Sequence, residues 1–344
     1  MYMIVLGIET SCDECAVAIL DGDSFVARIV ASQVKDHQVY GGVAPEVASR
    51  LHIEQISTTV DQAFKQANLL PKDIDLVAYT NRPGLMGSLL VGATFAKNFA
   101  WALKKPFVAV NHLLAHILVA RYVHKNLQFP FLGIVASGGH TTLMLIRGYK
   151  EDDVQILGAT MDDAIGECYD KVAKAYGLNY PGGPEVDHLA KQGASKAFNF
   201  PQPKLNRRFA GQYDLSYSGL KNAVINQRHQ FRREGFDDSL VNIMAGFQYA
   251  AIEQLIRTID RAAHDFKINQ VVIGGGVAAN SYLRQCMKEK SHLNFFDLPL
   301  SLCGDNGEMI AYYGKELYFA QDKQGDSLTV GVMPRVNLFR YQRV

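Results

Sequence analysis

A repeated pattern constrains the fold of this chain more than any other feature of its sequence. Leu6 to Leu20 reads LGIETSCDECAVAIL, and Leu132 to Ile146 reads LGIVASGGHTTLMLI. Each stretch is an apolar strand, a turn of small and polar residues and a second apolar strand, which is the pattern of a β-hairpin. Because one hairpin begins each half of the chain, we predict a duplicated α/β architecture with two lobes.

Between the hairpins, short apolar runs alternate with stretches of helical periodicity. Residues 74–80 and 107–110 predict strands, and residues 47–67 and 89–103 predict helices. This alternation favours a mostly parallel sheet, which binds its ligands at the carboxyl ends of the strands. The second half repeats the alternation, with predicted helices over 162–176, 239–266 and 307–321 and a predicted strand over 270–273.

The length of 344 residues suits two domains. We expect an N-terminal lobe over residues 1–128 and a C-terminal lobe over 129–324, whose last helix packs back toward the N-terminal lobe. Residues 325–344 read as an irregular tail. Phe129-Pro130 marks the expected boundary between the lobes.

The composition is typical of a globular protein and does not indicate a particular binding partner. Apolar residues make up 48% of the chain and the net charge is +1, so a nucleic acid would have to be held by a local basic patch. No apolar stretch reads as a membrane span. Five scattered cysteines, an odd number, favour the reducing cytoplasm. We therefore expect a cytoplasmic protein that does not associate with a membrane.

Two histidines follow the predicted strand 107–110. Asn111 can cap a helix that begins at once, and His112 and His116 then share one face of it, one turn apart. Two neutral imidazoles at this spacing can bind one metal ion. The pattern is short, however, and it also suits two histidines that are hydrogen-bonded by neighbours in an amphipathic helix.

Asp305 is the best candidate for a third metal ligand. It lies in the turn Cys303-Gly304-Asp305-Asn306 before the last predicted helix, where capping that helix is the alternative role. Two histidines and one carboxylate suit iron or zinc and leave coordination positions open. A zincin protease is excluded, because its general base would stand directly after the first histidine, where this chain has Leu113.

Three turns rich in small residues follow predicted strands, at 11–14, 137–140 and 274–280. Backbone N–H groups in such turns bind phosphate oxygens, so a nucleotide ligand is indicated. Neither a GxGxxG fingerprint nor a GxxxxGK[ST] loop is present. The CxxC pair Cys12 and Cys15 is a weak candidate for a redox centre, because a strand rather than a helix is expected after it.

Several longer motifs together resemble the tRNA N6-adenosine threonylcarbamoyltransferase family (TsaD, Kae and Qri, formerly called the glycoprotease family). The resemblance runs from Ile4 to about Gly314 and rests on GIETSCDE, YGGVAPEVASRLH, RPGLMGSLLVG, NHLLAH, ASGGHT, YPGGP, SYSGLK, GGGVAAN and CGDNGEMIAYYG. It implies the actin-like ATPase (ASKHA) fold, in which two duplicated RNase-H-like lobes enclose a central cleft. This expectation agrees with the repeated hairpin.

The resemblance also implies an acyltransferase reaction. Members of the family transfer the threonylcarbamoyl group of threonylcarbamoyl-AMP to N6 of adenosine 37 in tRNAs that read ANN codons, giving t6A and AMP. The implied partners are therefore tRNA and threonylcarbamoyl-AMP. In bacteria, a paralogous ASKHA protein and a small P-loop ATPase would assist.

By position, the resemblance makes His112, His116 and Asp305 the ligands of one divalent metal, with Fe²⁺ favoured and Zn²⁺ the alternative. Asp13 and Glu14 are candidates for handling the proton of the adenosine amine, and a structural role in their turn is the alternative. The residues that the resemblance assigns to nucleotide and substrate binding are Val135, Ala136, Ser137, Gly138, Gly139, Asp170, Gly183, Asp187 and Asn280.

Two other functions stay open. Another small-molecule kinase of the ASKHA fold would keep the glycine turns but would not need the histidine pair, and a non-catalytic scaffold paralogue would be expected to have lost it. A basic region with interspersed aromatic residues is the candidate surface for tRNA, with a solvated basic face as the alternative. It comprises Lys204, Arg207, Arg208, Lys221, Arg228, His229, Arg232 and Arg233 with Tyr213, Tyr217 and Phe231.

Overall fold

The computed structural model describes residues 2–201, 211–234 and 240–335, without the side chains of 229–234. The described chain forms two compact units. The first contains residues 2–126, 148–153 and 304–335, and the second contains residues 127–147 and 154–303. The chain thus leaves the first unit and returns to it twice.

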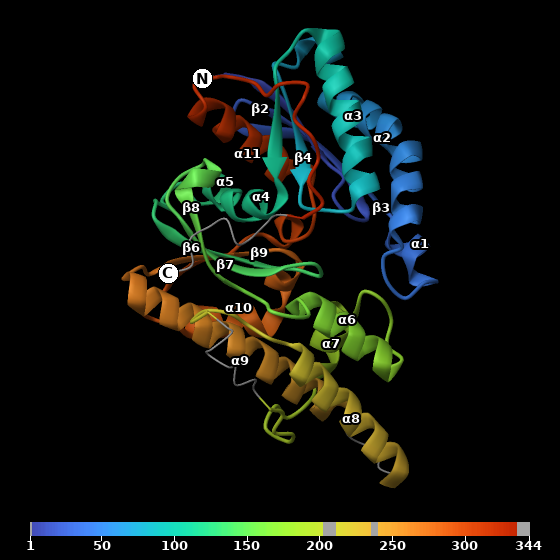
Figure 1. The fold of residues 1–344 in the computed structure, drawn as a ribbon, viewed down its shortest axis with the longest axis vertical. Coiled ribbons are helices and arrows are strands. Elements are labelled where there is room, and N and C mark those ends of the chain that lie inside the picture. Colours follow the sequence, from blue (N-terminus) through green and yellow to red (C-terminus); the bar gives the residue numbers. More distant parts are fainter. Residues whose placement is uncertain (1, 202–210, 235–239, 336–344) are drawn as a thin grey trace. The chain divides into compact units, whose positions relative to one another are not determined.

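The first unit is built on a five-stranded sheet with the order β3-β2-β1-β4-β5, and Figure 1 labels β2, β3 and β4 of this sheet. The first hairpin and β3 pair antiparallel, while β4 and β5 extend the sheet in parallel from β1. The strands are β1 (Ile4–Glu9), β2 (Glu14–Asp21), β3 (Ser24–Ser32), β4 (Leu76–Arg82) and β5 (Phe107–Asn111).

The second unit repeats this sheet strand for strand, with the order β10-β9-β6-β7-β8. Even the register is the same, because Leu6 pairs with Ile19 in one hairpin and Leu132 pairs with Leu145 in the other. The predicted duplication is therefore confirmed. The strands are β6 (Phe131–Ala136), β7 (Thr141–Ile146), β8 (Val154–Ala159), β9 (Gln270–Gly274) and β10 (Asn294–Phe296).

The expectation of mostly parallel sheets was wrong. Each sheet has two antiparallel and two parallel pairings, because β3 and β8 each follow their hairpin through a short connection and so continue it antiparallel. Neither of these strands was predicted. The burial of β3 alternates between its two faces, which gives a weaker apolar signal than the fully buried β1.

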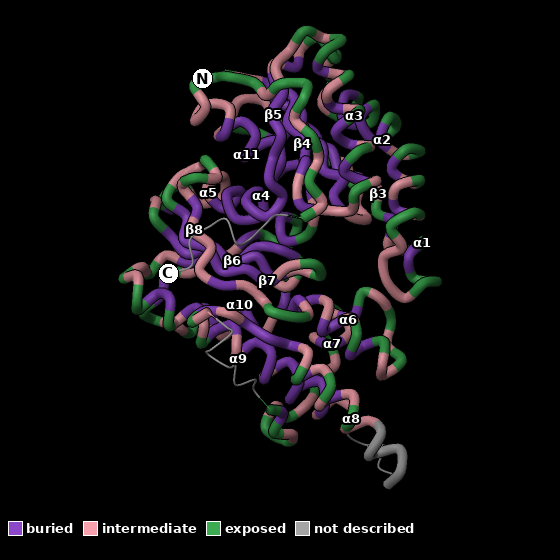
Figure 2. The backbone as a smooth tube through the Cα atoms, viewed as in Figure 1, coloured by how far each residue is buried: buried purple, intermediate pink, exposed green. Residues whose placement is uncertain are grey.

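Helices cover both faces of the first sheet. On one face, α2 (Pro45–Ala67) and α3 (Met86–Leu103) bury residues that recur at helical spacing, such as Ile56, Val60 and Phe64. The opposite face carries α11 (Gly307–Ala320), as Figure 1 shows. Figure 2 shows the resulting burial of the central strands.

The approach of α11 to the sheet is unusually close. A Cβ at Gly7 would lie 2.5 Å from the backbone nitrogen of Ala311 and from the carbonyl oxygen of Gly307. Gly307 and Gly314 in turn lie against the backbone of β2 and the side chain of Ala78 on β4. Glycine on both surfaces therefore lets the helix backbone reach the strands and fixes the position of its first turn.

The remaining helices complete the two units. In the second unit, α9 (Leu240–Phe266) is a single long helix, and α7 (Gly182–Ala190) begins at Gly182. Among the described residues, no helix is both long and apolar enough for a membrane crossing. The α-helices not yet named are α1 (Val34–Gln38), α4 (His112–Leu118), α5 (Ala120–Val123), α6 (Ile165–Tyr176), α8 (Ser218–Glu234) and α10 (Ser281–Glu289).

Candidate metal centre and nucleotide-binding turns

The histidine helix α4 begins where its sequence predicts. Asn111, the last residue of β5, accepts hydrogen bonds from the backbone N–H groups of Leu113 and Leu114 at 3.0 and 3.4 Å. Its side-chain amide donates to Glu151, which also pairs with Arg82. The end of the strand and the start of the helix are thus held together, and His112 occupies the first helical position.

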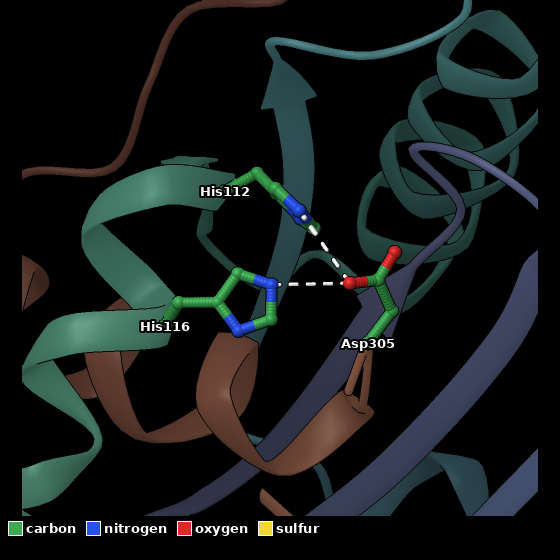
Figure 3. Close-up of side chains that lie close together, drawn as sticks. All are labelled: His112, His116 and Asp305. Carbon is green, nitrogen blue, oxygen red and sulfur yellow. Dashed lines mark hydrogen bonds and ion pairs between the residues drawn. The ribbon is translucent and has the colours of Figure 1, made fainter. Parts of the chain in front are cut away.

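Asp305 contacts the same helix, although it follows His116 by 189 residues in the sequence. Its alternative role as a cap is wrong, because the side chain of Asn306 caps α11 by accepting from the backbone of Met309 at 2.8 Å. The carboxylate of Asp305 instead faces the histidines (Figure 3). Its Oδ1 lies 3.0 Å from Nε2 of His116 and 3.6 Å from Nε2 of His112.

These three side chains fit a metal ion. Their potential ligand atoms lie within 4.8 Å of one another, and both Nε2 atoms point at the same carboxylate oxygen (Figure 3). A transition metal bound at about 2.0–2.2 Å from nitrogen and oxygen ligands needs a spacing of this size. His116 is fully buried and His112 is 8% exposed, so both imidazoles are held in place.

The two histidines differ in charge in the metal-free protein. Burial lowers the pKa of His116, which therefore offers a neutral ring nitrogen. Burial acts in the same direction on His112, but the negative charges of Glu9 and Asp305 outweigh it and raise the pKa of His112 to about 9. An acidic environment of this kind also favours a divalent cation.

Asp13 lies in the turn between β1 and β2, and Glu14 is the first residue of β2. Burial is the main cause that raises the pKa of Asp13, with the charge of Asp305 adding to it. Burial also raises the pKa of Glu14 to about 7, although a hydrogen bond from Ser32 opposes the shift. The structure therefore places both carboxyl groups within the electrostatic influence of Asp305.

The CxxC pair has none of the features of a redox centre. Both thiols are free, and Cys15 is buried in β2. Burial raises the pKa of Cys12 and raises the pKa of Cys15 to about 11, whereas a reactive cysteine needs a lowered pKa.

In the second unit, the predicted nucleotide turns lie against one another at the carboxyl ends of β6 and β9. A Cβ at Gly275 would lie 2.5 Å from the carbonyl oxygen of Ala136, and the backbone N–H of Gly166 donates to the carbonyl of Ser137. Gly138 and Gly139 are exposed, and a Cβ on either would meet open space. Val135 and Ala136 are buried in the strand itself.

The other predicted binding residues lie in α6, in α7 and at the start of α10. Asp170 on α6 accepts a hydrogen bond from the backbone of Gly182 at 2.8 Å, next to Gly183. Asp187 on α7 accepts a hydrogen bond from Ser281, which follows Asn280. Asn280 caps α10 and also donates to Gln248, so its side chain has a structural role.

The basic region was predicted partly wrongly. Tyr213 and Tyr217 are 7% and 0% exposed, so neither can stack on an RNA base. Lys221 is paired with Asp163 at 2.5 Å. Arg228 lies over the ring of Tyr176. Lys204, Arg207 and Arg208, and the side chains of His229, Phe231, Arg232 and Arg233, lie outside the described residues.

One residue beside the candidate metal centre was missed by the sequence analysis. Oε2 of Glu9 lies 3.0 Å from Nδ1 of His112 and accepts a hydrogen bond from Thr80 at 2.6 Å. The signal was present in the sequence, since Glu9 is the one charged residue of the strand IVLGIE, and a charge without a partner is costly to bury.

Solved structures show which class of fold the two repeated sheets define. The Acidaminococcus fermentans (R)-2-hydroxyglutaryl-CoA dehydratase component A aligns with a TM-score of 0.57 at 15% identity, over 91% of this chain and 97% of that chain. HypF of T. kodakarensis aligns with a TM-score of 0.58 at 17% identity, over 93% of this chain and 48% of that chain. The protein has the actin-like ATPase fold, as predicted.

Sequence comparison identifies the family. The family model described as tRNA N6-adenosine threonylcarbamoyltransferase matches residues 24–312. The proteins of that name from Treponema denticola and Borreliella burgdorferi are 47% and 43% identical to this chain, over 98% and 99% of it and 98% and 96% of their own lengths. The chain therefore belongs to the tRNA N6-adenosine threonylcarbamoyltransferase family, and it is a transferase.

Proposed function

We propose that the protein transfers the threonylcarbamoyl group of threonylcarbamoyl-AMP to N6 of adenosine 37 in tRNAs that read ANN codons. The names of the relatives support the tRNA nucleoside and the transferred group. The observation that carries the proposal to this chain is the convergence of His112, His116 and Asp305. A kinase of this fold would not need these three side chains, and a scaffold would not be expected to keep them.

The proposed reaction is an acyl transfer at a mixed anhydride. The N6 amine attacks the carbamoyl carbon, a C–N bond forms, and the bond from that carbon to the phosphate oxygen breaks. AMP leaves with the electron pair, and the amine loses one proton. Because an exocyclic amine is a weak nucleophile, the reaction depends on holding the two substrates in position and stabilising charge.

The metal site would bind the mixed anhydride of threonylcarbamoyl-AMP. His112, His116 and Asp305 would hold one divalent ion, Fe²⁺ by preference or Zn²⁺, and leave coordination positions open for substrate oxygens. The bound ion would polarise the carbamoyl carbonyl or hold the phosphate.

The protein's own backbone and side chains would bind the adenylate and accept the proton of the amine. The backbone of 135–139 and the open space beside Gly138, Gly139 and Gly183 would receive the adenylate, with Asp170 at the ribose hydroxyls. Asp187 and Asn280 would contribute further contacts with the substrate, and Asn280 also fixes the start of α10. Glu14, with a pKa of about 7, is suited to accept the proton of the amine near neutral pH, and Asp13 would assist.

The proposal extends to partners and location. A cytoplasmic enzyme acting on tRNA accords with the family, and we propose that a paralogous actin-like protein and a small P-loop ATPase support it. Because Lys221 is paired with Asp163 and Tyr213 and Tyr217 are buried, we propose that other residues make most of the contacts with tRNA.

A transfer assay tests the function. The metal-loaded protein is mixed with threonylcarbamoyl-AMP and an unmodified ANN-reading tRNA, with and without the two partner proteins, and the nucleosides are analysed by mass spectrometry. We expect t6A from the parent protein and a loss of about a hundredfold or more in H112A and H116A. H264A is the matched control, because the side chain of His264 is 89% exposed.

Each outcome has a distinct meaning. Equal product from the parent and from both histidine variants would keep the transfer but contradict a role for the metal. No product in the presence of both partners would contradict the proposed reaction. Hydrolysis of ATP by the parent in that case would point to the kinase alternative.

A further inference from the structure

Glu9 lies beside the candidate metal centre, where its carboxylate contacts the ring of His112. It is the last residue of β1 and is fully buried. Residues of a strand alternate between the two faces, and Ile4, Leu6 and Ile8 belong to the core under α2 and α3. Glu9 therefore shares the opposite face with Gly7, which is the face that α11 covers.

The acceptor positions of the Glu9 carboxylate are occupied by donors from three segments. Oε1 accepts from the backbone N–H of Ser11, and Oε2 accepts from the hydroxyl of Thr80 on β4. Oε2 also lies 3.0 Å from Nδ1 of His112 on α4, and the hydroxyl oxygen of Ser11 lies 3.2 Å from the same nitrogen. Because its other two partners are donors, the carboxylate cannot turn away, and it presents a fixed acceptor to the imidazole.

We propose that Glu9 is a positioning residue for the metal ligand His112, which it holds in the tautomer that carries its proton on Nδ1. This inference rests on the metal site of the proposed function. A carboxylate can only accept, so Nδ1–H donates to Glu9 and the lone pair of Nε2 is left facing Oδ1 of Asp305, 3.6 Å away. Histidine ligands of metals are commonly fixed by such a second partner.

The competing explanation is that Glu9 only neutralises a buried imidazolium. In that case any uncharged residue of the same shape would leave metal binding unchanged, provided that the protein folds. The variant E9Q separates the two explanations. If its carbonyl oxygen keeps the bond from Ser11, its amide N–H₂ faces Nδ1 of His112 and donates to it. The histidine proton then moves to Nε2, which is the proposed ligand atom.

The matched control is E308Q. Glu308 is also a buried carboxylate of the first unit, 7% exposed, but its partner is Arg28 at 2.6 Å. The affinity of each metal-free protein for Zn²⁺ is measured by competition with a chromophoric chelator, and folding is checked by thermal unfolding with EDTA. We expect E9Q to bind Zn²⁺ about 10- to 100-fold more weakly than the parent, and E308Q to bind it equally.

A second measurement reads the tautomer directly. In the Zn²⁺-loaded parent labelled with ¹⁵N-histidine, NMR should show His112 with a proton on Nδ1, identified by the loss of its signals in H112A. E9Q at saturating Zn²⁺ should lack this signal pattern. If E9Q fails to fold, E9D replaces it, because the shorter carboxylate draws back from the imidazole and should also weaken Zn²⁺ binding.

Zn²⁺ affinity within twofold of the parent in a folded Glu9 variant would overturn the inference while leaving the transfer reaction intact. A parent that binds no Zn²⁺ would overturn it as well, since no ligand would need positioning. Weakened Zn²⁺ binding in E9Q would support the inference even if the parent showed no transfer to tRNA. The two proposals can therefore fail separately.

Discussion

Glu14 shows how a single carboxyl group can be set for proton transfer by its surroundings. It is the first residue of β2, and burial raises its pKa from 4.5 to about 7. One of its oxygens is buried with no hydrogen-bond partner, so the ionised form is poorly solvated. This environment lowers the free energy of unfolding when Glu14 is ionised, and the decrease can be measured.

The variant E14Q should become more stable than the parent as pH rises. Between pH 4.5 and 7 the folded parent keeps a proton that its unfolded chain has released, so its free energy of unfolding falls through this range. Because Glu14 is only partly buried and solvent screens its charge, we expect a relative gain of about 1–2 kcal/mol for E14Q at pH 8 compared with pH 4.

Urea unfolding with EDTA at both pH values measures this difference. The exposed Glu54 on α2 provides the control E54Q, which should follow the parent at both. A constant difference between E14Q and the parent across the pH range would contradict the raised pKa of Glu14.

At the scale of elements, the candidate metal centre depends on how two helix starts are fixed. Asn111 sets the start of α4, and Asn306 sets the start of α11 directly after Asp305. The position of α11 depends further on Gly7, since no side chain fits between that strand position and the helix backbone.

The substitution G7A should displace α11 and with it Asp305. Its Cβ would lie 2.5 Å from backbone atoms of the helix, and overpacking of this kind costs about 1–3 kcal/mol. We expect a lower free energy of unfolding in urea and weaker Zn²⁺ binding. G219A is the control, because a Cβ at Gly219 would meet nothing within 4 Å. Unchanged Zn²⁺ affinity in G7A would show that Asp305 does not depend on this contact.

Part of the structure around the candidate metal centre could be predicted from sequence patterns. The hairpins and the cap of α4 are local, so a single apolar pattern or side chain predicts them. Glu9 was missed because its partners Thr80 and His112 lie 71 and 103 residues away, and local periodicity carries no information about such pairs. Asp305 was predicted as a third ligand from its turn and from the family resemblance, but no local pattern predicts its contact with His116, which lies 189 residues away. The role of these residues as metal ligands stays a prediction.

At the scale of the whole molecule, the two repeats carry different predicted ligands. The metal candidates lie in the first unit and the adenylate turns in the second. Hydrogen exchange followed by mass spectrometry should therefore separate the two ligands. Zn²⁺ should slow exchange in α4 and in the first turn of α11, while AMP should slow it around 135–139 and 182–187. Protection of 135–139 by Zn²⁺ alone would contradict this division.

The return of the chain to its first unit also has a consequence during synthesis. The five strands of the first sheet and both histidines precede residue 117, but Asp305 follows His116 by 189 residues. At ribosomal speeds of about 5–20 residues per second, this interval lasts roughly ten to forty seconds. Throughout it, the nascent sheet lacks the helix that covers one of its faces, and the two histidines lack their carboxylate. A newly made chain can therefore acquire its complete set of candidate ligands only after residue 305 has been synthesised.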